Sequence, residues 1–222
     1  MDFEHRLDRR KNVSDSQEGT CEWIWEHPTF VEWKGLHHGI LWIQGKPGSG
    51  KSTLSKMLTE RLPFLDARAR DLSGSRNAID AKPSLVIDHF YSARQGHRRS
   101  KQQGTSHEMM LRSVIHDLLE ELPCLFALIR HKFRTLDTLG SGEISWVWDD
   151  LKKVLNYICI GSELPHNLPK IIVLLDALDE SNLDAAKGAT GPQLLEYLDD
   201  LVQCWENARK DELPFQIGRA HV

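Results

Sequence analysis

The chain has 222 residues, with 28 Lys and Arg against 32 Asp and Glu, and a formal net charge of −4 at pH 7. This length is enough for one large domain with a sizeable core. The mildly acidic balance argues against a dedicated nucleic-acid binder, and the first residues, MDFEHRLDRR, are too polar for a signal peptide. The four scattered cysteines form no CxxC pair, so reduced thiols in an intracellular protein are expected rather than disulfides or a zinc site.

The first third of the chain predicts a charged lead-in, a strand and a helix. Residues 1–18 are dense in mixed charge and lack apolar periodicity, so we expect them to be mobile. The short apolar run 39–44 predicts a buried strand. An amphipathic helix is predicted over 51–62, and the polar segment 66–82 is expected to be a loop.

The remaining elements alternate between strands and helices. A second strand is predicted over 84–91, and the continuous apolar run Ile171–Leu175 is typical of a strand buried on both faces of a parallel sheet. Apolar residues recur at helical spacing in four further segments, namely 111–122, 125–133, 151–158 and 194–205. Strands separated by helices predict an α/β domain with a mainly parallel sheet.

A phosphate-binding loop is the strongest motif. The pattern G-x-x-x-x-G-K-[ST] is met by Gly45, Lys46, Pro47, Gly48, Ser49, Gly50, Lys51 and Ser52, with Thr53 next. Glycines let the backbone approach polyphosphate oxygens closely, and the following helix directs the positive end of its dipole at them. Lys51 is expected to reach the β- and γ-phosphates, and the Ser52 hydroxyl to ligate Mg²⁺.

A second acidic site follows the predicted strand at 171–175. Asp176 is placed at the carboxyl edge of the sheet, where it is expected to hold Mg²⁺ beside the phosphate loop. Asp179 and Glu180 are candidates for orienting or deprotonating an attacking water, although a solvated turn or helix cap is an alternative for both.

These motifs resemble a known family. Residues 20–23 (TCEW), 41–53 (LWIQGKPGSGKST), 110–113 (MLRS) and 174–180 (LLDALDE) are similar to the NACHT module of STAND P-loop NTPases. The similarity is to the fungal NOD-like receptor type, also described as the nephrocystin-3-like N-terminal region. It spans roughly residues 20–216.

The resemblance implies a P-loop NTPase three-layer sandwich over residues 19–216. It implies a cytoplasmic, nucleotide-controlled signalling switch that binds Mg²⁺ with ATP or GTP and hydrolyses it slowly. Effector and repeat-sensor domains would be its partners in a longer protein, and it would form a homo-oligomer on activation. No membrane and no specific nucleic acid is implied.

The C-terminal end departs from the family pattern. The family continues with a strand ending in a sensor Arg and with winged-helix subdomains, whereas here residues 213–216 match only the start of that strand. The tail 217–222 resembles a translated sequencing adapter and is expected to be non-native. The sandwich is therefore expected to be incomplete at the C-terminus, and Arg219 is assigned no sensor role.

Other readings of the chain stay open or are weaker. A P-loop small-molecule kinase and a nucleotide-binding scaffold without turnover are the alternatives. A Ras-like GTPase ranks low because no N/T-K-x-D motif is found. The basic stretch 94–101 and the pair His37 and His38 are expected to be solvated loop residues. Trp23, Trp25 and Trp33 are each expected to pack in the core, with adenine stacking as an alternative.

Overall fold

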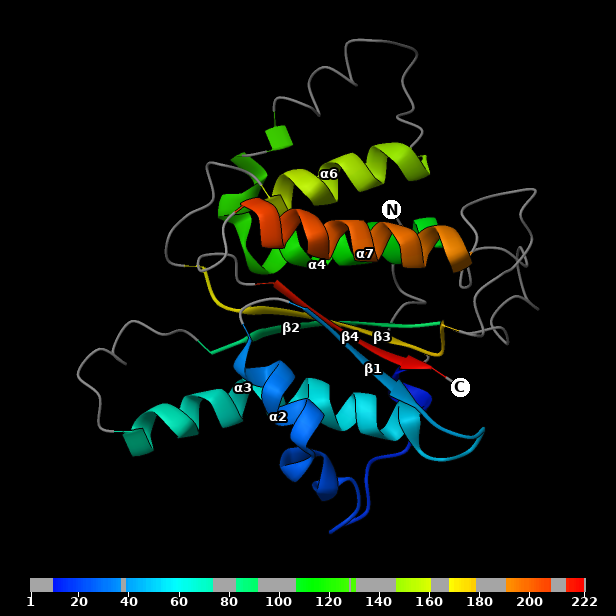
Figure 1. Ribbon diagram of the computed structural model, residues 1–222, viewed down its shortest axis with the longest axis vertical. Helices are drawn as coiled ribbons and strands as arrows, with labels where there is room; N and C mark the ends of the chain where they lie inside the picture. The colour runs from blue at the N-terminus through cyan, green and yellow to red at the C-terminus, as the bar shows by residue number, and fades with distance from the viewer. Residues whose placement is uncertain are drawn as a thin grey trace.

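The computed structural model describes residues 10–36, 39–73, 83–91, 107–127, 129–130, 147–160, 168–178, 191–208 and 215–221. Strands and helices alternate along them (Figure 1). In chain order the elements are η1 (Glu22–Glu26), α2 (Pro28–Gly35), β1 (Gly39–Gln44), α3 (Lys51–Ser73), β2 (Leu85–Phe90), α4 (His107–Glu121), η4 (Pro123–Leu125), α6 (Trp148–Ile160), β3 (Ile171–Asp176), α7 (Gly191–Ala208) and β4 (Phe215–His221). The predicted mixed α/β class is confirmed.

The four strands form one parallel sheet in the spatial order β1-β4-β3-β2. Parallel neighbours cannot be joined by a tight turn, so each connection crosses a face of the sheet and carries helix. Figure 1 shows α2 and α3 on one face and α4, α6 and α7 on the other. All four strands therefore end at the same edge of the sheet, which is the edge that carries ligand sites in open parallel sheets.

Strand β3 separates two hydrophobic cores. All six of its residues are buried, as its continuous apolar run predicted. Ile172 and Leu174 belong to the core that includes α2 and α3. Ile171, Val173 and Leu175 belong to the core formed with α4, α6 and α7. This alternation is the period-two geometry of a strand, so alternate side chains of β3 point to opposite faces of the sheet.

Helix α3 is longer than the sequence predicted. It runs from Lys51 to Ser73 with Pro63 inside it, whereas the pattern indicated an end near Leu62 and a loop over 66–82. A proline removes one backbone hydrogen bond and usually ends a helix. Residues 65–72, LDARARDL, are mostly strong helix formers, so the helix continues. Residues 74–82 lie outside the described residues.

Strand β4 occupies the centre of the sheet. Its residues pair in parallel with β1 on one side and β3 on the other, with Gly218 opposite both Leu41 and Leu174. The sequence pattern indicated only the start of this strand, yet residues 217–221 continue it to His221. Backbone hydrogen bonds on both edges hold such a strand even where its side chains show weak strand preference.

Several broader expectations can also be compared with the structure. All four cysteines are free. Trp33 is buried and its indole N–H donates to the Gly39 carbonyl at 3.3 Å, whereas Trp23 is 55% exposed, so core packing was a wrong expectation for Trp23. Trp25 is half-buried. Within the described part of the chain, no helix combines the length and the apolar character needed to cross a bilayer.

Candidate functional site

The predicted phosphate loop joins the end of β1 to the start of α3. Gly48 and Gly50 have φ angles of +76° and +85°, in the left-handed region that L side chains rarely adopt. A Cβ placed on Gly45 would lie 2.7 Å from the Ser49 Oγ, closer than such atoms approach in proteins. Gly48 and Gly50 are therefore required by the path of the loop backbone, whereas a side chain at Gly45 would require the Ser49 hydroxyl to move. Residues 46–50 are exposed, so the loop is open to a ligand.

The loop curls directly into the helix. The Ser49 N–H donates to the Lys46 carbonyl at 3.1 Å, and the Leu54 N–H donates to the Gly50 carbonyl at 2.8 Å. The latter is the first turn of α3, so the N–H groups of the residues just before Leu54 have no intrahelical acceptor. Those donors and the positive end of the helix dipole make this end of α3 a favourable place for an anion.

Lys51 turns back over the loop. Its Nζ donates to the Gly45 carbonyl at 2.9 Å and to the Lys46 carbonyl at 3.0 Å. The ammonium group is thus held against the first residues of the loop rather than extended into solvent. The Lys51 ammonium group therefore lies within the same short segment that presents the backbone donors.

Asp176 points from the end of β3 toward α3. Asp176 lies two positions after Leu174 and four after Ile172, and alternate residues of a strand point to the same face of the sheet. Its side chain is therefore on the α3 face. The residue is 1% exposed, and its Oδ1 accepts a hydrogen bond of 3.2 Å from the Ser55 hydroxyl. A charge-assisted contact of this kind is the usual requirement for a buried carboxylate.

Helix α3 spans the distance between the loop and this carboxylate. Because β4 lies between β1 and β3, the tips of β1 and β3 are two strand spacings apart, about 10 Å. Ser55 is four residues after Lys51, an axial rise of about 6 Å, and it contacts Asp176. The structure therefore brings the predicted loop and the predicted acidic strand end together, although 125 positions, 176 minus 51, separate them in the sequence.

Ser55 is a site residue that the motif does not contain. The half-buried Ser52 and Thr53 lie in the first turn of α3, and the hydrogen bond to Asp176 comes from one turn later. Residues three apart lie on the same face of a helix. A second serine three positions after Ser52 is the sequence signal that could have indicated this contact.

A strained turn follows Asp176. Ala177 is 8% exposed and has a φ of 55°, a left-handed conformation that costs a non-glycine residue about 1 kcal/mol. The Asp176 carbonyl accepts the Tyr91 N–H at 3.1 Å, so the chain following β2 is tied to this turn. Asp179 and Glu180 lie outside the described residues, as do His37, His38 and the basic stretch 94–101.

A buried polar pair lies on the opposite face of the same edge. The Tyr91 hydroxyl and the His107 Nδ1 are 2.9 Å apart, and both residues are almost fully buried. Burial lowers the pKa of His107 to about 4 and raises that of Tyr91 well above its usual value. His107 is therefore neutral at physiological pH, and Tyr91 belongs to the core formed with α4, α6 and α7.

Comparison with known proteins covers most of the chain. The family model described as Nephrocystin 3, N-terminal, matches residues 19–210. The matched range contains the loop, Ser55 and Asp176, and it begins after residues 10–15. No curated protein matches the chain.

Proposed function

This chain belongs to the Nephrocystin 3, N-terminal, family, a region found in fungal NACHT/STAND proteins, and on that premise we propose that it binds a nucleoside triphosphate with Mg²⁺. The observation that carries the proposal is the meeting of a glycine loop, a helix N-terminus and a buried carboxylate at one edge of a parallel sheet. Each part alone is common in proteins. Their combination provides N–H donors for an anion and a ligand for a cation at the same edge of the sheet.

The residues present suit the two ligands. The exposed backbone of residues 46–50 and the start of α3, with Ser52 and Thr53, supply N–H donors for phosphate oxygens. Lys51 adds the positive charge. The Ser52 hydroxyl and the Asp176 carboxylate are oxygen donors of the kind that Mg²⁺ prefers. When bound, Mg²⁺ neutralises part of the charge on the phosphates.

The proposal also covers the fold class and the biological role of the domain. A parallel sheet with helices on both faces and a glycine loop after β1 supports the P-loop NTPase three-layer sandwich. We assign the domain to an intracellular signalling switch, cytoplasmic, with effector and sensor domains as partners and with a homo-oligomer as its active form. Family membership is the support for these roles.

Hydrolysis in this domain is proposed to be slow. Asp179 and Glu180 follow the Asp176 turn and are assigned the role of orienting the attacking water. The loop is exposed to solvent, and an open site lacks the closure that completes most phosphoryl-transfer centres. Release of phosphate without an added acceptor alcohol would support hydrolysis, whereas turnover that requires such an alcohol would support the small-molecule kinase alternative.

Titration with fluorescent ATP and GTP analogues, with Mg²⁺ or with EDTA, tests the proposal. Lys51→Ala removes the loop ammonium and is expected to weaken binding about tenfold or more, since contacts to charged groups contribute roughly 1.5–3 kcal/mol. Lys153→Ala is the matched control, because this α6 lysine is 66% exposed and pairs only with the surface residue Asp150 among the contacts described. Far-UV circular dichroism checks the fold of both.

Two outcomes decide the assignment. Asp176→Asn is expected to reduce binding with Mg²⁺ and to leave binding in EDTA nearly unchanged, because only the cation requires the carboxylate charge. Unaltered nucleotide affinity in Lys51→Ala would contradict the phosphate assignment. Equal losses for Asp176→Asn with and without Mg²⁺ would contradict its role as a cation ligand.

A further inference from the structure

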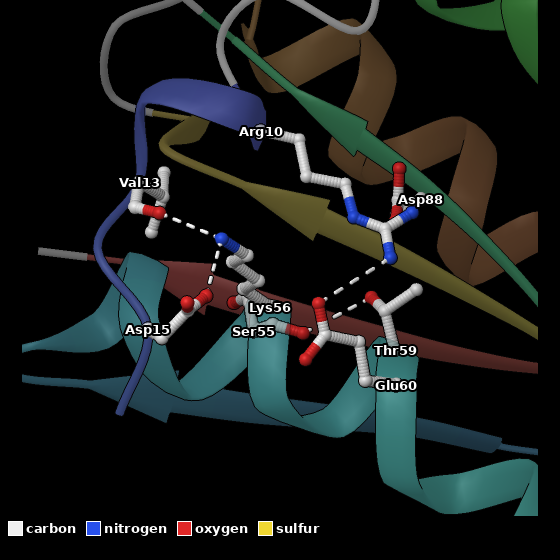
Figure 2. Close-up of polar contacts among 8 residues, drawn as sticks. All are labelled: Arg10, Val13, Asp15, Ser55, Lys56, Thr59, Glu60 and Asp88. Atoms are coloured by element: carbon white, nitrogen blue, oxygen red, sulfur yellow. Dashed lines mark hydrogen bonds and ion pairs between the residues drawn. The ribbon is translucent and has the colours of Figure 1, made fainter. Parts of the chain in front are cut away.

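The described segment before η1 is anchored to α3. Residues 10–15, here called the strap, pass over this helix near its beginning (Figure 2). The Lys56 Nζ donates to the Val13 carbonyl at 2.8 Å and pairs with the Asp15 carboxylate at 2.6 Å. One lysine of α3 therefore holds both the backbone and a side chain of the strap. The sequence pattern indicated a mobile lead-in and did not anticipate this contact.

A second anchor reaches the edge strand of the sheet. The Arg10 Nη1 lies 2.9 Å from the Asp88 carboxylate of β2, and the Arg10 Nη2 lies 3.9 Å from the Glu60 carboxylate of α3. Figure 2 shows Arg10 extended from the strap between these two elements. The strap thus links α3 to β2 through side-chain contacts with both elements.

The anchors are better shielded than ordinary surface ion pairs. The Lys56 side chain is 14% exposed and that of Asp88 is 12% exposed, whereas Asp15 is 84% exposed. An ion pair with one shielded member is screened less by salt than a fully exposed pair. The Val13 backbone carbonyl adds a charge-assisted hydrogen bond from the same lysine. Together the contacts define one docked position for the strap.

The same turn of α3 serves the strap and the candidate site. Ser55 donates to Asp176, and the next residue, Lys56, holds the strap. The Thr59 hydroxyl donates to the Ser55 carbonyl at 3.0 Å, which ties this turn to the next. A shift of this turn toward or away from the strap therefore also changes the contact that orients the Asp176 carboxylate.

We propose that the strap is a positioning element of the nucleotide site, which holds the second turn of α3 and through Ser55 sets the Asp176 carboxylate for its cation. The inference rests on the proposed function and extends it to residues outside the matched range of 19–210. Coupling between two binding events is reciprocal. Strap docking therefore strengthens Mg²⁺–nucleotide binding, and Mg²⁺–nucleotide binding strengthens strap docking by the same factor.

The first test measures nucleotide affinity in strap variants. Arg10→Gln and Asp15→Asn remove one anchor each and change no residue of the loop. Both are expected to weaken binding of the fluorescent nucleotide in Mg²⁺ by roughly fivefold, at the lower end of typical coupling, and to leave binding in EDTA unchanged. Asp149→Asn, which breaks the surface pair of Asp149 with Lys152 on α6, is the matched control and is expected to bind normally.

The second test measures the reciprocal effect. Trypsin cleaves after Arg10 and Lys11, and a docked strap protects these bonds. We expect Mg²⁺–nucleotide to slow this cleavage in the unaltered chain by about the same factor, and Asp15→Asn to abolish the protection. If the strap were only a structural tether, Mg²⁺–nucleotide would not change the cleavage rate of the unaltered chain, and that result would overturn the coupling.

The possible outcomes distinguish a failure of the coupling from a failure of the proposed function. If the unaltered chain binds no nucleotide, the proposed function fails and the coupling fails with it. If the unaltered chain binds but both strap variants bind equally well in Mg²⁺, the coupling alone is overturned. Weaker binding of the strap variants in EDTA as well as in Mg²⁺ would also overturn it, because the strap would then act on the whole fold rather than on the carboxylate.

Discussion

Removing the Ser55 hydroxyl tests the contact that joins α3 to the end of β3. Ser55 is 6% exposed and donates to a carboxylate that is 1% exposed. Ser113 in α4 provides a matched control. It is 1% exposed, and its hydroxyl oxygen has no hydrogen-bond partner among the described residues. Both serines lie within helices, so Ser→Ala changes the helix propensity of each by the same amount.

The expected magnitude follows from this difference. A hydrogen bond to a charged acceptor contributes about 1.5–3 kcal/mol, whereas the gain in helix propensity is about 0.5 kcal/mol. We expect Ser55→Ala to lower the free energy of unfolding by about 1–2.5 kcal/mol. Ser113→Ala is expected to leave it unchanged or to raise it by up to about 1 kcal/mol, because a buried hydroxyl without a partner is unfavourable.

Urea unfolding followed by tryptophan fluorescence measures both variants. For a chain of 222 residues, 1 kcal/mol corresponds to roughly 2–4 °C in Tm, so a difference of about 1–3.5 kcal/mol should separate the two variants by about 2–14 °C in thermal unfolding. The reasoning is refuted if the two variants differ by less than about 0.5 kcal/mol. In that case the Ser55 hydroxyl does not support the Asp176 carboxylate.

Three further predictions concern the loop, the buried histidine and the residues after Asp176. Gly50→Ala is expected to lower stability in urea by about 1–2 kcal/mol because its φ is +85°, whereas Gly35→Ala, which has open space, should not. Burial lowers the pKa of His107 from 6.5 to about 4. Between these values the unfolded chain binds a proton that the folded chain does not, so stability should fall as pH drops below 6.5, by at most about 1.4 kcal/mol per pH unit. His107→Gln should reduce the dependence of the free energy of unfolding on pH between pH 7 and pH 5. An unchanged dependence would show that other groups cause it. In a longer protein that contains the sensor domains, Asp179→Asn or Glu180→Gln should prolong the triphosphate-bound state, and normal turnover in both variants would remove their water-orienting role.

Local patterns were sufficient for the parts of the site that depend on neighbouring residues. The glycine spacing over 45–50 predicted the loop, because its left-handed angles at Gly48 and Gly50 require residues without a Cβ. The apolar run at 171–175 predicted a strand buried on both faces, and the strand ends at Asp176 as the pattern indicated. Period-two alternation then determined that Asp176 faces α3 once the faces of the sheet were known.

Longer-range features could not be predicted from the same patterns. The strand order places β4 between β1 and β3, and no local signal reports which strands become neighbours. The continuation of α3 past Pro63 also overrides a common stop signal. The Ser55 contact and the strap both depend on where α3 lies, so they follow from packing rather than from the motif.

The amino-acid sequence alone determined which residues can form a phosphate-binding loop and where a buried strand ends in a carboxylate, because backbone angles and hydrophobic periodicity act over a few residues. The tertiary structure alone decided that α3 carries Ser55 to Asp176 and Lys56 to the strap. Those contacts join residues that are 121 and 43 positions apart, and only the packing of α3 against the sheet brings such distant groups within hydrogen-bonding distance.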